Sequence, residues 1–245
     1  MKKNPVIIYA ALFAALAAFA GCGLTGKGGK DDSPITSKGR STNFSGTYNI
    51  EGPDYQGTLT IKKAGQGYTL EWNFPDGQTH YGTGIEMEGV LGAVYASEEN
   101  AGVAAYKKDG TKITGLWTPA SGEEIAYERS RGAKEIEISS RSIAGVYDVE
   151  GKYIDGEPYE NVLTLERTGD TYQAYWEWDD GSSFAGTGFL IDNIAVVGFG
   201  DEDGAGVTVY KVKGSTLDGK WLFTSYDDFS SVDKITLSPE KAVKQ

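Results

Sequence analysis

Short runs of alternating apolar and polar residues, separated by turn residues, fill the chain from residue 43 onward. In the run 68–74, aromatic and aliphatic residues alternate with Thr69, Glu71 and Asn73. Because successive side chains of a strand point to opposite faces, this alternation predicts strands with one buried and one wet face. Beyond residue 42 no stretch has a convincing helical period. The pattern therefore predicts an all-β fold.

The alternating runs occur twice along the chain. From Leu59 to Trp117 the sequence matches itself 104 positions later, and at both ends of the repeat the offset is 99. An extra loop near 153–157 in the second copy and another near 121–130 in the first would explain the two offsets. The copies are expected at 43–139 and 142–238, which predicts two tandem β-domains.

Each copy contains enough short runs for eight strands. In the first copy they are expected at Gly46–Ile50, Gly57–Lys62, Tyr68–Phe74, Thr79–Glu86, Val90–Ala96, Gly102–Lys107, Lys112–Thr118 and Glu135–Ser139. Asp76-Gly77 and Asp109-Gly110 suit tight hairpins, since glycine tolerates positive φ. Eight sequential strands predict an antiparallel up-and-down barrel in each copy, and a β-sandwich is the alternative.

Spaced glycines and aromatic residues recur in both copies. In the first they form Gly-x-Tyr ending at Tyr48, Tyr-x-x-x-Trp at 68–72, Gly-Thr-Gly at 82–84, Gly-Val-x-x-Tyr at 102–106 and Gly-x-Trp at 115–117. These motifs resemble a repeat of secreted bacterial proteins, some of which are labelled fibronectin-binding. The first motif is also similar to that of lipocalin- and avidin-like (calycin) barrels, which have Trp at the position of Tyr48. The resemblance implies a barrel and brings no binding residues with it.

The N-terminus is typical of an export signal. Lysines at positions 2 and 3 precede an uncharged apolar run at 6–20, and small residues lead to Cys22. This layout predicts a secretory signal peptide at 1–21, too short for a comfortable membrane-spanning helix, which needs about 20 apolar residues. It resembles the bacterial lipoprotein signal, which implies acylation of the Cys22 thiol and a membrane anchor. An ordinary signal peptide with an incidental cysteine is the alternative.

Residues 22–42 are predicted to be the lipidated cysteine followed by a flexible tether. The segment after Cys22 is rich in Gly, Ser, Thr and Lys, so it has almost nothing apolar to bury. Its lysines would lie near anionic headgroups, although a solubilising spacer explains them equally well. The residue after Cys22 is Gly23, whereas retention of a lipoprotein in the inner membrane is signalled by Asp at this position. The protein is therefore expected in the cell envelope, in the outer membrane if the cell is Gram-negative.

Composition excludes several functions. The formal net charge of −12 and the lack of a basic stripe argue against nucleic acid as a partner. A single cysteine allows no intrachain disulfide, and a single histidine, His80, excludes most histidine-based metal and triad chemistry. Adjacent carboxylates such as Asp179 and Asp180 would point to opposite faces of a strand. We therefore expect no cofactor, no metal and no enzymatic activity.

The repeat separates core residues from candidate binding residues. Aromatic residues matched between the copies are expected in the core: Trp72/Trp176, Tyr106/Tyr210 and Trp117/Trp221. The second copy has additional aromatic residues, and the candidate binding residues are Tyr153, Tyr159, Tyr175 and Trp178, because Tyr and Trp are enriched in binding sites. Ordinary variation in loops and core would also explain them.

The sequence favours a non-catalytic binding or surface-interaction module. Its expected partners, besides the membrane, are a protein with a basic face or a glycan that stacks on aromatic rings. A lipocalin-like carrier of a small molecule is the first alternative, and it requires an apolar cavity inside a barrel. A structural lipoprotein of the envelope is the second alternative.

Overall fold

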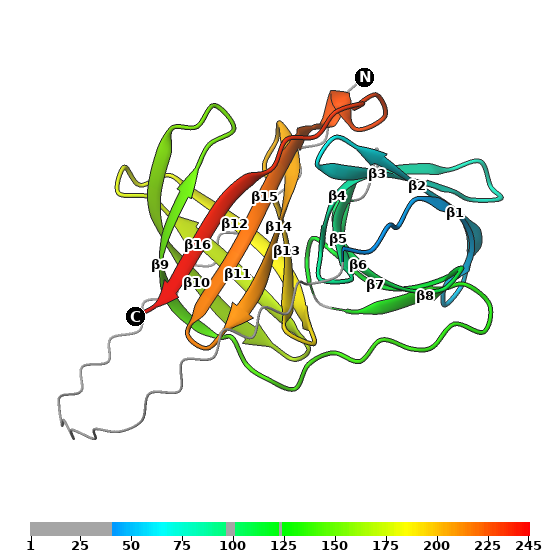
Figure 1. Ribbon diagram of the computed structural model, residues 1–245, viewed down its shortest axis with the longest axis horizontal. Helices are drawn as coiled ribbons and strands as arrows, with labels where there is room; N and C mark the ends of the chain where they lie inside the picture. Colours follow the sequence, from blue (N-terminus) through cyan, green and yellow to red (C-terminus); the bar gives the residue numbers. More distant parts are fainter. Residues whose placement is uncertain (1–40, 97–100, 123) are drawn as a thin grey trace, which may run out of the picture. The chain divides into compact units, whose positions relative to one another are not determined.

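The computed structural model describes residues 41–96, 101–122 and 124–245, and all but one of its regular elements are strands (Figure 1). The strands form two closed barrels, each of eight antiparallel strands. The expected tandem barrels are confirmed, and the sandwich alternative is excluded because each sheet closes on itself. Within these ranges no helix is both long and apolar enough to cross a membrane.

The first barrel follows the predicted strand order up to its last strand. It consists of β1 (Gly46–Glu51), β2 (Gln56–Ala64), β3 (Gly67–Asn73), β4 (Thr79–Met87), β5 (Val90–Ala96), β6 (Ala101–Asp109), β7 (Lys112–Pro119) and β8 (Ala126–Arg129). Figure 1 looks into this barrel from one end. The first seven predicted strands are therefore confirmed, with ends that differ by a few residues.

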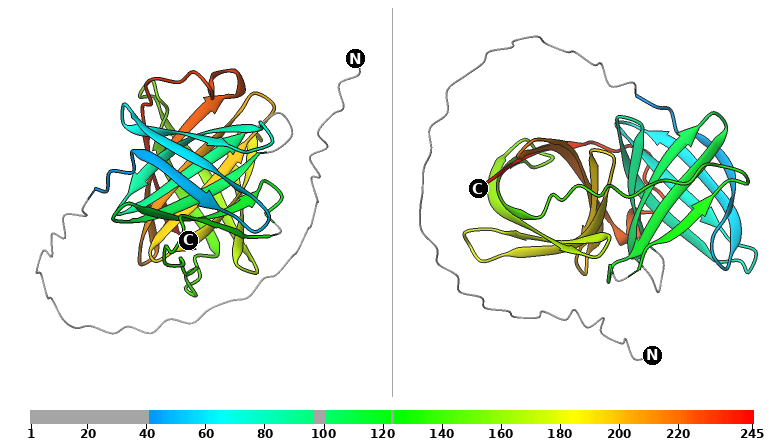
Figure 2. Two further views of the ribbon diagram at one scale, coloured as in Figure 1. Left: turned by 90° about the vertical axis from the view of Figure 1, so that its right-hand side faces the viewer. Right: turned by 90° about the horizontal axis from the view of Figure 1, so that it is seen from below.

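The second barrel repeats this arrangement. It consists of β9 (Gly145–Lys152), β10 (Pro158–Thr168), β11 (Thr171–Glu177), β12 (Ser183–Ile191), β13 (Ile194–Gly200), β14 (Gly204–Lys213), β15 (Thr216–Ser225) and β16 (Ser238–Lys244), with a short 3₁₀ helix η1 (Tyr226–Asp228) before β16. The right-hand view of Figure 2 shows its closed outline. This barrel extends to Lys244, beyond the boundary at 238 expected from the repeat.

The prediction of the eighth strand at Glu135–Ser139 is wrong. The closing strand of the first barrel is β8, which pairs with β7 and, at Arg129, with Glu51 of β1. The alternation of Glu135-Ile136-Glu137-Ile138 has another cause. Ile136 is buried in the cluster that contains side chains of both barrels, and Ile138 forms a β-bridge with Ile191 of the second barrel.

The matching segment of the second copy behaves in the same way. Ile235, which falls 99 positions after Ile136, forms a parallel bridge with Gly65 of the first barrel and is buried there. The 99-residue offset at the end of the repeat therefore joins two segments that each contact the other barrel. The closing strands themselves follow a different offset.

Three clusters of apolar side chains form the core. One fills the interior of each barrel, and the third lies between the outer faces of the two barrels. Strand β5 shows why: Leu91 and Ala93 point into the first barrel, whereas Val90 and Val94 belong to the cluster between the barrels. All seven residues of β5 are consequently buried.

The contact between the barrels relates equivalent positions. Lys107 pairs with Asp192 at 2.7 Å, and their counterparts, Lys211 and Glu88, also pair. At Gly92 a Cβ atom would lie 2.7 Å from a methyl carbon of Val196, so only glycine permits this approach. The two copies therefore contact each other as the subunits of a two-fold dimer do, within one chain.

Candidate functional site

Three of the four candidate aromatic residues meet at one end of the second barrel. The ring centroids of Tyr153 and Tyr159 are 4.8 Å apart, and those of Tyr159 and Trp178 are 6.4 Å apart. Tyr175 does not belong to this group, because it points outward from β11 and is 40% exposed. We call the end of the second barrel that contains Tyr153, Tyr159, Asn161, Trp178 and Trp221 the aromatic mouth. Cys22 lies outside the described residues.

Strand alternation and two turns place these side chains. Tyr159 and Asn161 point into the barrel from β10, and Trp178 follows directly after β11. The turn after Trp178 is closed by a hydrogen bond from its backbone N–H to the Ser182 carbonyl (3.0 Å). Tyr153 opens the other turn, in which its N–H donates to the Glu157 carbonyl at 2.8 Å.

Tyr153 and Trp178, at the loop ends, are more exposed than Tyr159, which lies below them. Tyr153 is 43% exposed, whereas Tyr159 is 8% exposed. Tyr159 also has a counterpart in the first copy, Tyr55, so it belongs to the shared barrel interior as well as to the mouth. Tyr153 has no such counterpart, because its loop is the insertion of the second copy.

A buried glutamate lies beneath the mouth. Glu240, on the closing strand β16, accepts hydrogen bonds from the hydroxyl groups of Tyr159 (2.5 Å) and Tyr210. Burial raises the pKa of this carboxyl group, and the tyrosine hydrogen bonds oppose that rise. Burial and the Glu240 charge together raise the pKa of Tyr159 and of Tyr210.

The first barrel has the same arrangement. Glu128, on β8, accepts hydrogen bonds from Tyr55 (2.7 Å), Tyr106 and the Trp72 indole N–H (3.0 Å). Desolvation raises the pKa of Glu128 as well. Since both barrels contain this cluster, we assign it to the shared fold, where it ties each closing strand to the barrel interior.

The sequence analysis did not identify either glutamate. Glu128 and Glu240 are 112 residues apart, so neither the 99-residue nor the 104-residue offset pairs them. The available signal was the set of core tyrosine and tryptophan residues that hydrogen-bond to the glutamates. Once Tyr106/Tyr210 and Trp72/Trp176 are placed in the core, their polar atoms require acceptors.

Several polar atoms of the mouth are buried without a partner among the described residues. They are both amide atoms of Asn161 and the indole nitrogens of Trp178 and Trp221. Asn161 is 8% exposed. The Trp221 N–H lies close enough to the Tyr159 hydroxyl to lower its pKa, but it makes no well-aligned hydrogen bond. The mouth therefore has unused hydrogen-bonding capacity.

His80 lies beside Trp72 in the first barrel, as Phe184 lies beside Trp176 in the second. Its ring stacks on Tyr95, with centroids 6.1 Å apart and planes 3° from parallel, and contacts Phe74 at 5.1 Å. Burial lowers the pKa of His80. Across the described ranges no group of three or more His, Cys, Asp or Glu side chains is arranged to hold a metal ion.

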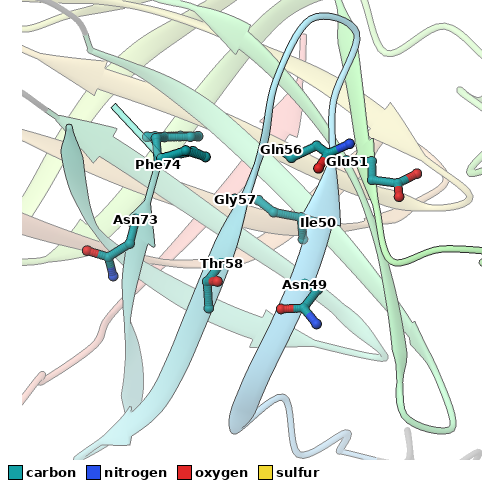
Figure 3. Close-up of a pocket in the computed structure, with 9 residues that line it drawn as sticks. Asn49, Ile50, Glu51, Gln56, Gly57, Thr58, Asn73 and Phe74 are labelled. Atoms are coloured by element: carbon teal, nitrogen blue, oxygen red, sulfur yellow. The ribbon is translucent and has the colours of Figure 1, made fainter. Parts of the chain in front are cut away.

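A hollow of about 430 Å³ lies on β1, β2 and β3 of the first barrel, and both polar side chains and the apolar Ile50 and Phe74 line it (Figure 3). Asn49, Thr58 and Asn73 lie side by side across these strands. In the second copy the corresponding positions of Asn49 and Asn73 are Asp148 and Glu177, both exposed. The same wall is therefore much more acidic in the second barrel.

Sequence comparison of the chain gives no match to a family model and no significant match to a curated protein. The two copies within the chain are thus the informative comparison. They share the glutamate clusters and differ at the mouth, where Gly57 and Phe74 of the first copy replace Asn161 and Trp178. Residues specific to the second copy are the candidates for recognition.

Proposed function

We propose that the protein is an exported, lipid-anchored binding module of the cell envelope, without catalytic activity, and that the second barrel binds its partner. The export-signal pattern, Cys22 and the hydrophilic segment that follows support the anchor and tether. An anchored chain of this kind presents its barrels to molecules outside the cytoplasm.

One observation above all supports binding at the surface. The barrel interiors are filled by their own side chains, including Trp72, Tyr106, Trp176 and Tyr210, whereas Tyr153 and Trp178 remain partly exposed at the mouth. A carrier would need that interior space for its ligand. Exposed aromatic rings at one end of a filled barrel instead favour contact with an external partner.

The carboxylates support a non-catalytic role. Glu128 and Glu240 are enclosed, and tyrosine hydroxyls already occupy their oxygens. The exposed Asp180 accepts hydrogen bonds from Ser182 within its own turn. An acid–base pair for hydrolysis needs two accessible carboxyl groups about 5–10 Å apart across a cleft.

Charge supports a partner with a basic or neutral face. The first copy (43–139) has 8 Lys and Arg against 14 Asp and Glu, a net charge of −6; the second (142–238) has 6 against 18, a net charge of −12. The additional carboxylates of the second copy include Asp148 and Glu177 on the outer wall. Such a surface speeds encounters with basic partners in a salt-dependent way.

Replacing the acyl acceptor tests the anchor. Cys22→Ser should move the protein from the membrane fraction to the soluble fraction or stop its processing, because a hydroxyl group does not substitute for the thiol. Detergent partitioning of both forms measures this. A variant that stays in the detergent phase like the parent would refute the lipid anchor.

A retention experiment tests whether the protein recognises a partner. The mature chain is immobilised, and the envelope or host-matrix material that it retains is measured. Retention should fall from low to physiological salt, and Tyr153→Ala should reduce it further. Tyr175→Glu places the first-copy residue on the outer wall, so this variant distinguishes recognition by the outer wall from recognition by the mouth. If neither Tyr153→Ala nor the salt concentration affects retention, the partner binds to another part of the protein. If nothing is retained, the structural-lipoprotein alternative is favoured.

A further inference from the structure

Asn161 is the strongest sign of a ligand in this molecule. Its side chain is more than nine-tenths buried, and neither amide atom has a hydrogen-bond partner in the described part of the chain. Strand alternation points it into the barrel beside Tyr159. Because an unpaired buried amide is costly, a group placed this way needs either water or a ligand.

Trp178 adds a second unpaired donor beside it. Continuing the register Val162↔Glu177 by one residue sets Asn161 opposite Trp178. The indole nitrogen of Trp178 is buried and unpaired among the described residues, while its ring is only partly covered. An amide N–H, an amide oxygen and an indole N–H therefore lie together at the mouth.

The first barrel shows what this position looks like without a site. Gly57 occupies the place of Asn161, and a Cβ atom there would lie 3.1 Å from the Phe74 ring. Phe74 thus packs over bare backbone and has no polar atom to satisfy. The second copy has replaced both residues of this apolar pair with hydrogen-bonding residues. Shared fold requirements do not explain that replacement.

The surroundings of Asn161 and Trp178 restrict the ligand chemistry. The turns around the mouth contain Asp155, Asp180 and Asp201, which disfavour an anion. The unpaired donors need an acceptor, and the Asn161 oxygen needs a donor. Tyr153 and Trp178 provide flat apolar surface. A neutral sugar unit meets all three requirements, because its hydroxyl groups both donate and accept and its C–H face packs on aromatic rings.

We infer that the aromatic mouth binds a neutral sugar unit, with Asn161 and Trp178 as hydrogen-bonding anchors and Tyr153 as a stacking surface. The inference rests on the proposed binding function and specifies its ligand class. The sugar belongs either to a free oligosaccharide or to the end of a larger glycan, and both present the same groups to the mouth.

Titration of two neutral trisaccharides tests the inference. The exported chain with Cys22→Ser is titrated with cellotriose and with the trimer of N-acetylglucosamine, and calorimetry and tryptophan fluorescence are measured. At least one should bind with a Kd of about 1 mM or tighter. A glucuronate-containing trisaccharide should bind more weakly, because the aspartates of the turns around the mouth repel its carboxylate. Retention on insoluble cellulose and chitin distinguishes a polymer-bound sugar from a free one.

Variants that remove the hydrogen-bonding groups of the mouth provide the decisive comparison. Trp178→Phe and Asn161→Val should each weaken binding at least about tenfold, because each removes a buried hydrogen-bonding group. Tyr153→Ala, at an exposed ring, should also weaken binding and is safe for folding. Tyr175→Glu, on the outer wall, is the matched control and should leave the affinity unchanged.

The inference is overturned if neither trisaccharide nor either polymer binds at about 10 mM sugar, far above the expected Kd. It is also overturned if Trp178→Phe and Tyr153→Ala bind as well as the parent. In either case, salt-dependent retention of an envelope or matrix partner would leave the proposed function standing. Loss of that retention as well would remove both.

Discussion

Glu240 and Glu128 each bring a carboxyl group into an interior made otherwise of aromatic and aliphatic side chains. Each accepts hydrogen bonds from two tyrosine hydroxyls, and Glu128 also accepts one from the Trp72 indole N–H. Removing one partner of such a cluster leaves the rest unpaired, which typically costs several kcal/mol. The contribution of each glutamate to the stability of the fold therefore depends on whether its carboxyl group is protonated.

Glu240→Gln should change how stability depends on pH. The folded-state pKa of Glu240 is raised by burial, so the fold favours its protonated form. Its stabilising contribution is therefore complete below the unfolded pKa, near 4.5, and is lost as pH rises through the raised folded value. Relative to the variant, the parent should therefore lose stability progressively as the pH rises through that window.

Urea unfolding of both proteins from pH 4 to pH 8 measures this difference. Glu160→Gln, on the exposed face of β10, is the control for replacing a carboxylate with an amide on the barrel surface. A constant difference between the parent and Glu240→Gln over the whole range would contradict the raised pKa.

The core aromatic residues could be predicted from the sequence, but the mouth could not be completed. Trp72, Trp176, Tyr106 and Tyr210 are matched between copies, and all four are buried as expected, whereas the matched pair Trp117/Trp221 is only partly buried. Asn161 escaped notice because an isolated asparagine on a strand has no pattern. Its importance depends on what lies opposite it at the end of the neighbouring strand, which only the register reveals.

At the scale of elements, the segments that leave the barrels are as important as the strands. Ile235 lies against Gly67, where a Cβ atom would come within 2.7 Å of the isoleucine side chain. The segment around Ile235 also donates and accepts backbone hydrogen bonds with Ala64 and Gln66 of the first barrel. It thereby extends the wall of the first barrel with residues from the second copy.

Ile235→Ala should destabilise the whole chain by about 2–4 kcal/mol, because it leaves a cavity in the cluster between the barrels. Ile154→Ala is the matched control, since Ile154 is 53% exposed and should change stability by no more than about 0.5 kcal/mol. Thermal and urea unfolding measure both. Equal effects would show that the segment does not stay on the first barrel in solution.

Strand alternation explains why elements were predicted well in the walls and poorly at the closure. Seven strands of the first copy follow from alternation and turn residues alone. The segment at 135–139 alternates equally well, but its isoleucines pack in the cluster between the two barrels, where Ile138 bridges to Ile191. Local pattern reports that one face is buried and says nothing of which partner buries it.

At the scale of the whole molecule, the two barrels share one apolar cluster. Phe189, Val196, Val209 and Leu222 of the second barrel pack there with Ile85, Val94 and Leu116 of the first. Two equivalent ion pairs, Lys107–Asp192 and Lys211–Glu88, lie beside it. These pairs are partly exposed, so the apolar contact dominates the association.

The second barrel alone, residues 142–245, should therefore be less stable than the full chain and should self-associate. Separation exposes the outer faces of β12 to β15, which in the full chain are buried. Light scattering, dye binding and thermal unfolding of the fragment and the full chain measure this. A monomeric fragment as stable as the full chain would show that the shared cluster adds nothing.

The chain crosses from the second copy back to the first in the segment 229–237, almost at its C-terminus. If the chain is exported as proposed, it emerges with its N-terminus first, so the first barrel leaves the export channel before the segment that completes its outer wall. Until Phe229 and Ile235 arrive, part of its apolar surface faces water. Under the proposed export, this order leaves an interval in which a chaperone would protect the exposed surface of the first barrel, and the arrival of the segment 229–237 ends that interval.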